Sequence, residues 1–361
     1  MTPRQFSSKL LSWHKKHGRH DLPWQHNTSS YRVWVSEIML QQTQVTTVID
    51  YYTRFMKRFK NVQALANAEI DEVLHLWTGL GYYARARNLH AAAIIVCEQY
   101  NGQFPDNLDA MIALPGIGRS TAAAVLALSQ NQHQSILDGN VKRVLSRFYC
   151  VEGWYGKREV VQQLWSLSEQ HTPKKHCAQY TQAIMDLGAT LCRRSKPDCE
   201  HCPVQAGCES FATDRVAEFP HSKPKKRIPV RSTAMLFLRN HNDDVLLQLR
   251  PPSGIWGGLW SCPEADCATT AKALKSWCAK QLSYSLSQIQ VGEVIRHTFS
   301  HFHLDITPVY ARAESDSQRI MDSTDSVWYN TQQPDARGLA APVKLLLQSH
   351  AATIQNLTTE C

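Results

Sequence analysis

The stretch from residue 112 to residue 144 constrains the fold most strongly, because it places two turns directly before two helices. Residues 114–120 (LPGIGRS) form a proline–glycine turn that opens into an alanine-rich run at 121–128. Gly116 and Gly118 permit backbone conformations and close approaches that a side chain would block. The N–H groups of the following first helical turn favour an anion such as phosphate. This turn predicts a grip on a nucleic-acid backbone, with an ordinary helix–helix bend as the alternative.

The second half of the stretch, residues 136–144 (ILDGNVKRV), sets a single acid before another helix with apolar periodicity. Asp138 directly precedes that helix, and Asn140 and Lys142 follow within four residues. We interpret Asp138 as a catalytic carboxylate.

Length, hydropathy and cysteine usage limit the class of protein. A chain of 361 residues suggests two to three domains. No apolar run reaches membrane-spanning length, and the N-terminus lacks a signal-peptide pattern, so we expect a cytoplasmic protein with no membrane partner. The eleven cysteines are then expected to be metal ligands or reduced thiols rather than a disulfide framework.

The net charge of +8 is distributed unevenly. Residues 1–231 contain 29 Lys and Arg against 19 Asp and Glu, a balance of +10, whereas residues 232–361 have a balance of −2. The first part therefore favours a polyanionic partner.

Residues 1–130 are predicted to be mostly helical, with helices near residues 6–13, across 31–52, and at 71–76, 84–100 and 108–114. A further helical region spans 151–191. Glu37 lies among apolar neighbours in the second of these helices, where desolvation would raise its pKa and suit it to donating a proton. A solvated helix face is the alternative. The nearby Gln42 and Thr43 are uncharged hydrogen-bonding residues that suit base edges better than phosphates.

A second glycine turn occupies residues 78–83 (TGLGYY). Leu80 and Tyr82 in this turn, followed by Arg85 and Arg87, have the composition of a wedge that enters a base step. The alternative is core packing, which we favour for Tyr83.

Four cysteines follow within 17 residues: Cys192, Cys199, Cys202 and Cys208. Such an all-sulfur set suits an iron–sulfur cluster or zinc. Structural zinc sites usually have two short Cys-x2–4-Cys pairs, whereas this set has one, so we favour a [4Fe–4S] cluster.

The remaining sequence changes character. Residues 219–229 are basic and proline-rich and are predicted to be a linker, and 233–238 with 244–249 are predicted to form a strand hairpin. Residues 250–260 (RPPSGIWGGLW) resemble the opening of a Nudix domain. The helix expected at 268–281 contains no acidic residue, so the metal-dependent hydrolysis of Nudix enzymes is excluded and a recognition role is expected. Residues 342–361 are predicted to form a closing helix.

Residues 296–303 (RHTFSHFH) allow two interpretations. As one continuous strand they would place His297, His301 and His303 on one face as a candidate metal site. Alternatively, Phe299, Ser300 and His301 form a loop with neutral groups that suit a base edge or a nearby phosphate.

Together, the hairpin glycines, Asp138 and the four cysteines resemble the helix-hairpin-helix base-excision glycosylases of the endonuclease III type. Residues 36–44 (SEIMLQQTQ), 79–85 (GLGYYAR) and 137–141 (LDGNV) resemble the adenine DNA glycosylase (MutY) family in particular. The resemblance covers nearly the whole chain. The fold that it implies is an all-α helix-hairpin-helix glycosylase with an iron–sulfur loop, plus an α+β Nudix-like C-terminal domain.

The implied domain limits are a helical region at 1–218, a linker at 219–231 and a Nudix-like domain at 232–361. Within the helical region, a six-helix module at about 30–135 would contain the hairpin. The N-terminal helix and residues 136–218 would form the module that binds the cluster.

The resemblance also implies a reaction. A monomer would remove adenine mispaired with 8-oxoguanine or guanine from double-stranded DNA, after the base is flipped out of the stack. Glu37 would protonate adenine N7 and help to activate water, Asp138 would stabilise the oxocarbenium-like sugar, and Asn140 would orient Asp138 or the substrate. Gln42 and Tyr82 would fill and wedge the opened duplex.

Other residues gain expected roles from the same resemblance. Thr43 would lie near the base opposite adenine, and the Phe299–His301 loop would read the 8-oxoguanine strand. Relatives that also cut the strand have a lysine nucleophile at the position of Ser120, and a serine cannot form the Schiff base. Lys142 could form only an adventitious imine. We therefore expect a monofunctional glycosylase. The alternatives are a bifunctional pyrimidine-damage glycosylase/lyase and a non-enzymatic iron–sulfur redox sensor that binds DNA.

Overall fold

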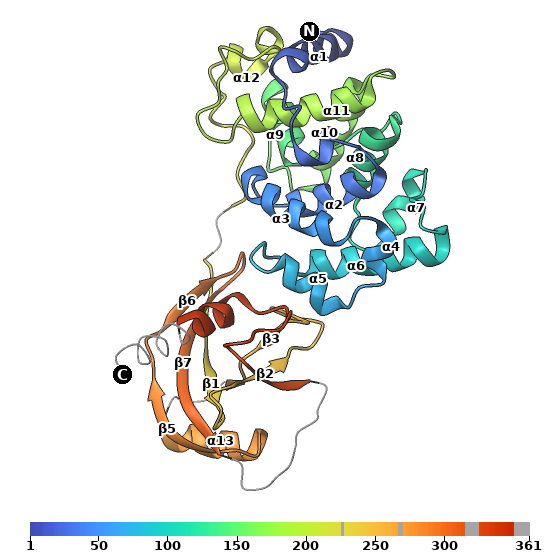
Figure 1. Ribbon diagram of the computed structural model, residues 1–361. Helices are drawn as coiled ribbons and strands as arrows, with labels where there is room; N and C mark the ends of the chain where they lie inside the picture. Colours follow the sequence, from blue (N-terminus) through green and yellow to red (C-terminus); the bar gives the residue numbers. More distant parts are fainter. Residues whose placement is uncertain (225–226, 266–269, 315–324, 350–361) are drawn as a thin grey trace. The chain divides into compact units, whose positions relative to one another are not determined.

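The computed structural model describes residues 1–224, 227–265, 270–314 and 325–349 (Figure 1). It contains two compact units, residues 1–68 with 87–225 and residues 69–86 with 226–361. Three predicted segments lie partly outside the described residues. They are the linker (Lys225 and Lys226), the helix predicted at 268–281 (Ala268 and Thr269) and the closing helix (350–361). Within the described part of the chain, no helix is both long enough and apolar enough to cross a membrane.

The first unit is helical, as predicted. Before the hairpin turn it contains α1 (Pro3–His17), α2 (Ser30–Leu40), α3 (Val45–Arg58), α4 (Val62–Ala66), α6 (Ala84–Tyr100) and α7 (Leu108–Ala113). The first three residues of α6 are assigned to the second unit. After the turn come α8 (Arg119–Gln130), α9 (Gly139–Phe148), α10 (Arg158–His171), α11 (Cys177–Asp186) and α12 (Glu209–Ala212). Helix α5 (Ile70–Trp77) falls in the second unit.

The prediction of one helical run across residues 31–52 is wrong, because α2 ends at Leu40 and α3 begins at Val45. Apolar residues continue across the break because α2 is buried on most sides and α3 buries one face, which hides the break from a periodicity analysis. Gln42 adopts a left-handed backbone conformation, with φ of 56°. The break therefore places Gln42 and Thr43 in a turn.

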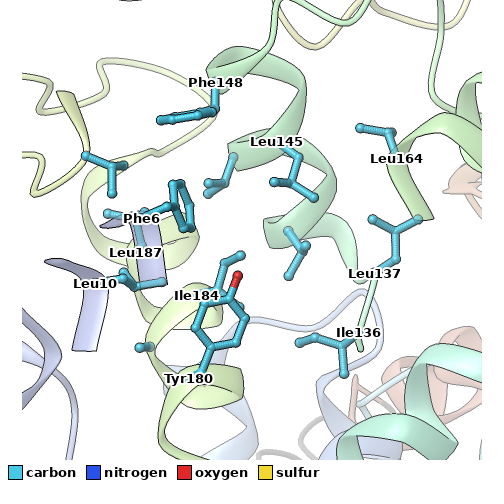
Figure 2. Close-up of a cluster of buried hydrophobic side chains, with 14 of the residues drawn as sticks. Phe6, Leu10, Ile136, Leu137, Leu145, Phe148, Leu164, Tyr180, Ile184 and Leu187 are labelled. Atoms are coloured by element: carbon cyan, nitrogen blue, oxygen red, sulfur yellow. The ribbon is translucent and has the colours of Figure 1, made fainter. Parts of the chain in front are cut away.

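A hydrophobic cluster holds the segment before Asp138 in place (Figure 2). Ile136 and Leu137 are buried in the same cluster as Phe6 of α1, Leu145 of α9 and Ile184 of α11. Each fully buried side chain of this size contributes about 1.5–3 kcal/mol. Asp138 thus follows directly after two anchored residues.

The second unit contains a mixed β-sheet with the order β3-β2-β1-β7-β5. These strands are β1 (Val230–Arg239), β2 (Val245–Leu249), β3 (Trp260–Ser261), β5 (Ser285–Val291) and β7 (His303–Glu314). The short strands β4 (Glu264–Ala265), β6 (Ile295–Thr298) and β8 (Ser326–Tyr329) pair with β1, β7 and β2, and the helix is α13 (Ala271–Gln281). The predicted β1–β2 hairpin is confirmed by the antiparallel pairing of Arg239 with Val245. Residues 341–349 are helical, in agreement with the start of the predicted closing helix.

The continuous-strand alternative for residues 296–303 is wrong. Strand β6 ends at Thr298, and the chain reverses so that Thr298 pairs with His303 in β7. Because cross-strand partners share a face and neighbours alternate, His297 and His303 project to opposite faces. The candidate three-histidine metal site is therefore not formed, and Phe299–His301 lie in the connecting turn.

Candidate active site

One cavity of about 810 Å³ in the first unit collects six of the predicted site residues. Glu37 comes from α2, and Asp138 comes from the residue before α9, about a hundred positions later in the sequence. The two acids face the same space, as the predicted reaction requires. The other four predicted residues on its wall are Gln42, Thr43, Ser120 and Asn140.

The environment of Glu37 favours its protonated form. Its side chain is half-buried among the apolar residues of α2, and this burial together with the nearby charge of Asp138 raises its pKa to about 8. Burial is the larger cause. Near neutral pH the group is therefore an acid that can donate a proton into the cavity.

Asp138 is the N-cap of α9. Its Oδ1 accepts a hydrogen bond from the Val141 backbone N–H at 2.8 Å, and its Oδ2 accepts one from the Asn140 amide at 2.9 Å. Burial raises the pKa of Asp138, but these two hydrogen bonds and the charge of Arg143 oppose that rise. Because both bonds stabilise the ionised form, we assign the carboxylate to Asp138 and the proton to Glu37.

Arg143 was missed in the sequence analysis, although it occupies the same helical face as Asn140. It donates to Asn140 Oδ1 at 2.8 Å and to the carbonyl oxygens of Gly188 and Cys192, both at 2.7 Å. The Asn140 amide is thereby fixed with its nitrogen toward Asp138. The spacing of three residues from Asn140 to Arg143 was the available signal.

Arg19 and Gln182 also line the cavity and were missed. Both bind Asp186, whose side chain is fully buried: Arg19 donates through its backbone and its guanidinium at 2.6–2.9 Å, and Gln182 donates at 2.9 Å. Burial raises the pKa of Asp186, but the contact with His14 at 3.4 Å and the charge and hydrogen bonds of Arg19 outweigh it and leave the pKa lowered. No local sequence pattern links Arg19 to a partner 167 residues away.

Ser120 and Lys142 differ in their surroundings. Ser120 lines the cavity, and its Oγ accepts a hydrogen bond at 2.9 Å from the backbone N–H of Leu137, the residue before Asp138. Lys142 is outside the lining of the cavity, and its ammonium lies 5.6 Å from the centre of the Tyr155 ring. Burial lowers the pKa of Lys142.

The two hairpin glycines, Gly116 and Gly118, differ in how strictly the structure requires glycine at their positions. Gly116 has a φ of 74°, and a Cβ there would lie 2.7 Å from the Asn88 Cβ. Gly118 is the N-cap of α8, and a Cβ there would meet no atom of the chain within 4 Å. Packing within the protein therefore does not require glycine at 118, since the space that a Cβ would occupy there is open.

The second glycine turn belongs to the second unit. Tyr82 is 51% exposed with a left-handed backbone, whereas Leu80 and Tyr83 are buried. Tyr83 is buried, in agreement with the core packing predicted for it. Leu80, which was predicted to be part of the wedge, is buried as well. Arg85 was expected to flank the wedge toward DNA. Instead it donates to the carbonyl oxygens of Leu80 and Gly81 at 3.2 Å and lies over the Tyr82 ring.

The four clustered cysteines line one small cavity together with apolar side chains such as Leu187. All described cysteines are free thiols. Arg147 donates to the sulfur of Cys192 at 3.4 Å, and its backbone carbonyl faces Cys208. Within the described ranges, no three His, Cys, Asp or Glu converge closely enough to hold a single ion. A mononuclear zinc site needs all its ligands at about 2.0–2.3 Å from the metal.

In the β6–β7 turn, Ser300 and His301 are exposed, Phe299 is half-buried and Phe302 is buried. The Phe299 N–H donates to the Phe302 carbonyl at 2.9 Å and closes the turn. The exposed tip thus has the hydroxyl and imidazole groups expected for contact with a base or phosphate.

Comparisons with known proteins agree with these features. Residues 35–170 match the HhH-GPD superfamily of base excision DNA repair proteins, and residues 234–349 match the NUDIX domain family. The solved structure of a thermostable thymine-DNA glycosylase aligns with a TM-score of 0.52 and 28% identity, over 58% of this chain and 97% of that chain. The predicted fold class, a helical glycosylase region followed by a Nudix domain, is confirmed.

Relatives that match most of this chain identify the family within this superfamily. The adenine DNA glycosylase of Buchnera aphidicola subsp. Acyrthosiphon pisum is 37% identical, with 98% of this chain and 100% of the relative covered. The adenine DNA glycosylase of Mus musculus is 34% identical, with 83% and 69% covered. On this similarity over nearly the entire sequence, together with two acids that share one cavity, the chain belongs to the adenine DNA glycosylase family.

Proposed function

We propose that this chain excises adenine mispaired with 8-oxoguanine or guanine in double-stranded DNA, as a monofunctional glycosylase that acts as a monomer. The observation that supports this most directly is the pair formed by Glu37 and Asp138. They line one cavity large enough for a flipped nucleoside, and their surroundings favour different protonation states.

Glu37 starts the reaction by donating its proton to N7 of the flipped adenine. The C–N glycosidic bond then breaks, its electron pair leaves with the base, and positive charge develops on the sugar. The Asp138 carboxylate, held by Val141 and Asn140, stabilises that charge. The Glu37 carboxylate takes a proton from the attacking water and is ready for another cycle.

Other predicted residues would bind and distort the duplex. The glycines of the hairpin would let the first turn of α8 approach a phosphate, with Gly118 at the open position. Gln42 and Tyr82 would fill and wedge the base stack, and Thr43 would lie by the opposite base. The left-handed backbone of both Gln42 and Tyr82 projects these side chains from tight turns.

The four cysteines would hold a [4Fe–4S] cluster. Their side chains line a common cavity together with apolar residues, and an all-cysteine set of four is the usual ligand set of such a cluster. When bound, the cluster would brace the loop whose Cys192 carbonyl accepts a hydrogen bond from Arg143.

The alternatives lack comparable support. A strand-cutting lyase needs an amine at position 120, where Ser120 instead accepts a hydrogen bond from Leu137. A redox sensor without enzymatic activity would leave the Glu37–Asp138 pair without a purpose.

Single-turnover excision from a duplex with adenine opposite 8-oxoguanine tests the proposal. The wild type should release adenine without cutting the strand, and Glu37→Gln and Asp138→Asn should lose turnover while they retain DNA binding. Unchanged turnover in either variant would refute the assigned roles. Strand cleavage at the rate of base release would favour the lyase.

A further inference from the structure

The turn that is proposed to read the opposite base rests on an aromatic cluster formed by Trp256, His297, Phe299 and Phe302. The Trp256 ring lies 5.3 Å from His297 and 5.3 Å from Phe299, measured between ring centres. His297 packs edge-on against Phe299 at 4.7 Å, and Phe299 stacks on Phe302 at 4.6 Å. Phe299 is therefore enclosed by three rings, at separations where aromatic pairs attract each other.

Trp256 is itself held firmly. It is only 7% exposed and has a left-handed backbone with φ of 52°, a conformation that a tryptophan adopts only when its surroundings require it. Arg250 enforces this geometry, because its Nε donates to the Ile255 carbonyl at 3.1 Å and its guanidinium lies over the Trp256 ring. Arg250 is in turn paired with Glu264.

The glycines around Trp256 complete the support. A Cβ at Gly257 would lie 2.4 Å from the carbonyl oxygen of Pro252, so the loop can close only with glycine at this position. The Gly258 N–H donates to the carbonyl oxygens of Arg250 and Pro251. This is the segment that resembles the opening of a Nudix domain. In this chain the loop places the Trp256 ring against Phe299 of the β6–β7 turn.

The turn has a buried base and an exposed tip, and the His301 ring of the tip also packs edge-on against Phe302 at 4.8 Å. Phe302 is 1% exposed, and the Arg231 guanidinium lies over its ring at 4.6 Å. Ser300 and His301 are exposed at the tip. Phe299 connects the buried base of the turn to its tip, since its ring meets the cluster and its backbone precedes the tip.

We infer that Trp256 is a positioning residue for selection of the base opposite adenine, because it fixes Phe299 and through it the Ser300–His301 tip. The inference rests on the proposed reading role of that turn. It assigns to the Nudix-like segment a task in this chain: a base reader works only if its position is held to within a fraction of an ångström.

The test compares single-turnover excision of adenine opposite 8-oxoguanine with excision opposite guanine, with protein in excess over DNA but below saturation. Trp256→Ala should reduce the ratio of the two rates by roughly three- to tenfold, the scale of one lost aromatic contact. Trp256→Phe should restore most of the ratio. Trp328→Ala is the matched control, because Trp328 packs edge-on against Tyr284 at 5.6 Å in the same unit, apart from the cluster.

Each outcome decides something. A normal ratio for Trp256→Ala, or an equal loss for Trp328→Ala, would overturn the positioning role, whatever the change in melting temperature. Phe299→Ala separates this failure from failure of the proposed function. If Phe299→Ala leaves the ratio unchanged, the turn does not read the opposite base. If Phe299→Ala lowers the ratio and Trp256→Ala does not, only the inference about Trp256 fails.

Discussion

Replacing Glu37 by glutamine keeps the size of the side chain but removes its titration, and the structure fixes what this should do to stability. The pKa of Glu37 in the folded chain is about 8, against an ordinary value of 4.5. The folded state thus holds the proton more tightly than the unfolded state. The contribution of Glu37 to the free energy of unfolding is therefore fully present below about pH 4.5. It is lost as pH rises toward about 8, above which the free energy of unfolding no longer depends on this group.

The size of the effect follows from the same two values. Each pH unit inside this window costs up to about 1.4 kcal/mol. Between pH 5.5 and 7.5 the free energy of unfolding of the wild type should fall by at most about 3 kcal/mol relative to that of Glu37→Gln. This corresponds to roughly 6–12 °C in Tm. Water in the cavity reduces this figure.

Thermal unfolding at a series of pH values measures the difference. The Glu37→Gln variant should melt above the wild type by a margin that widens with pH, while its adenine excision is lost. Glu98→Gln, which changes an exposed carboxylate on α6, should parallel the wild type. Wild-type and Glu37→Gln curves that stay parallel from pH 5.5 to 7.5 would show that Glu37 is not held protonated, and the assignment of the acid would fall with it.

Three further predictions concern the other parts of the site. Asp138→Asn should slow single-turnover excision by roughly 10²–10³-fold, because asparagine can still cap α9 through its Oδ1 but has no negative charge to stabilise the sugar cation; a rate within threefold of the wild type would contradict the role of the carboxylate. Cys199→Ser should lower the iron content of the purified protein and its melting temperature, and iron analysis with full occupancy would remove Cys199 from the ligand set. Borohydride should trap at most a minor covalent adduct with DNA, and Lys142→Ala should abolish it; an abundant adduct that survives this change would point to another amine and revive the lyase.

Much of the site was predictable because its chemistry is concentrated in short motifs. Glu37, Asp138 and Asn140 stand next to apolar runs that define their helices, and these residues do line one cavity. Periodicity failed at the α2–α3 break, because apolar residues of the largely buried α2 and of α3 continue on both sides of the turn that contains Gln42.

Long-range partners were beyond local patterns. The sequence places Arg85 beside the predicted wedge, but it does not reveal that the guanidinium donates to two carbonyl groups of the same turn. Likewise, the contact of Arg19 with Asp186 depends on how α1 and α11 pack, which no spacing rule encodes. A charged side chain is assigned to solvent or to the interior by tertiary packing, and that packing is absent from a single sequence.

The position of Asp138 at the start of α9 has a consequence for inherited variation. The same carboxylate caps the helix through Val141 and faces the cavity, so most substitutions there remove the proposed catalytic carboxylate and loosen a helix end together. Losing such a cap costs about 1 kcal/mol. In a cell, that deficit exposes the polypeptide to proteases, so inert alleles at this codon should also be scarce proteins. Asparagine is a partial exception, because its Oδ1 can keep the cap on Val141, although its amide nitrogen cannot accept the hydrogen bond from Asn140.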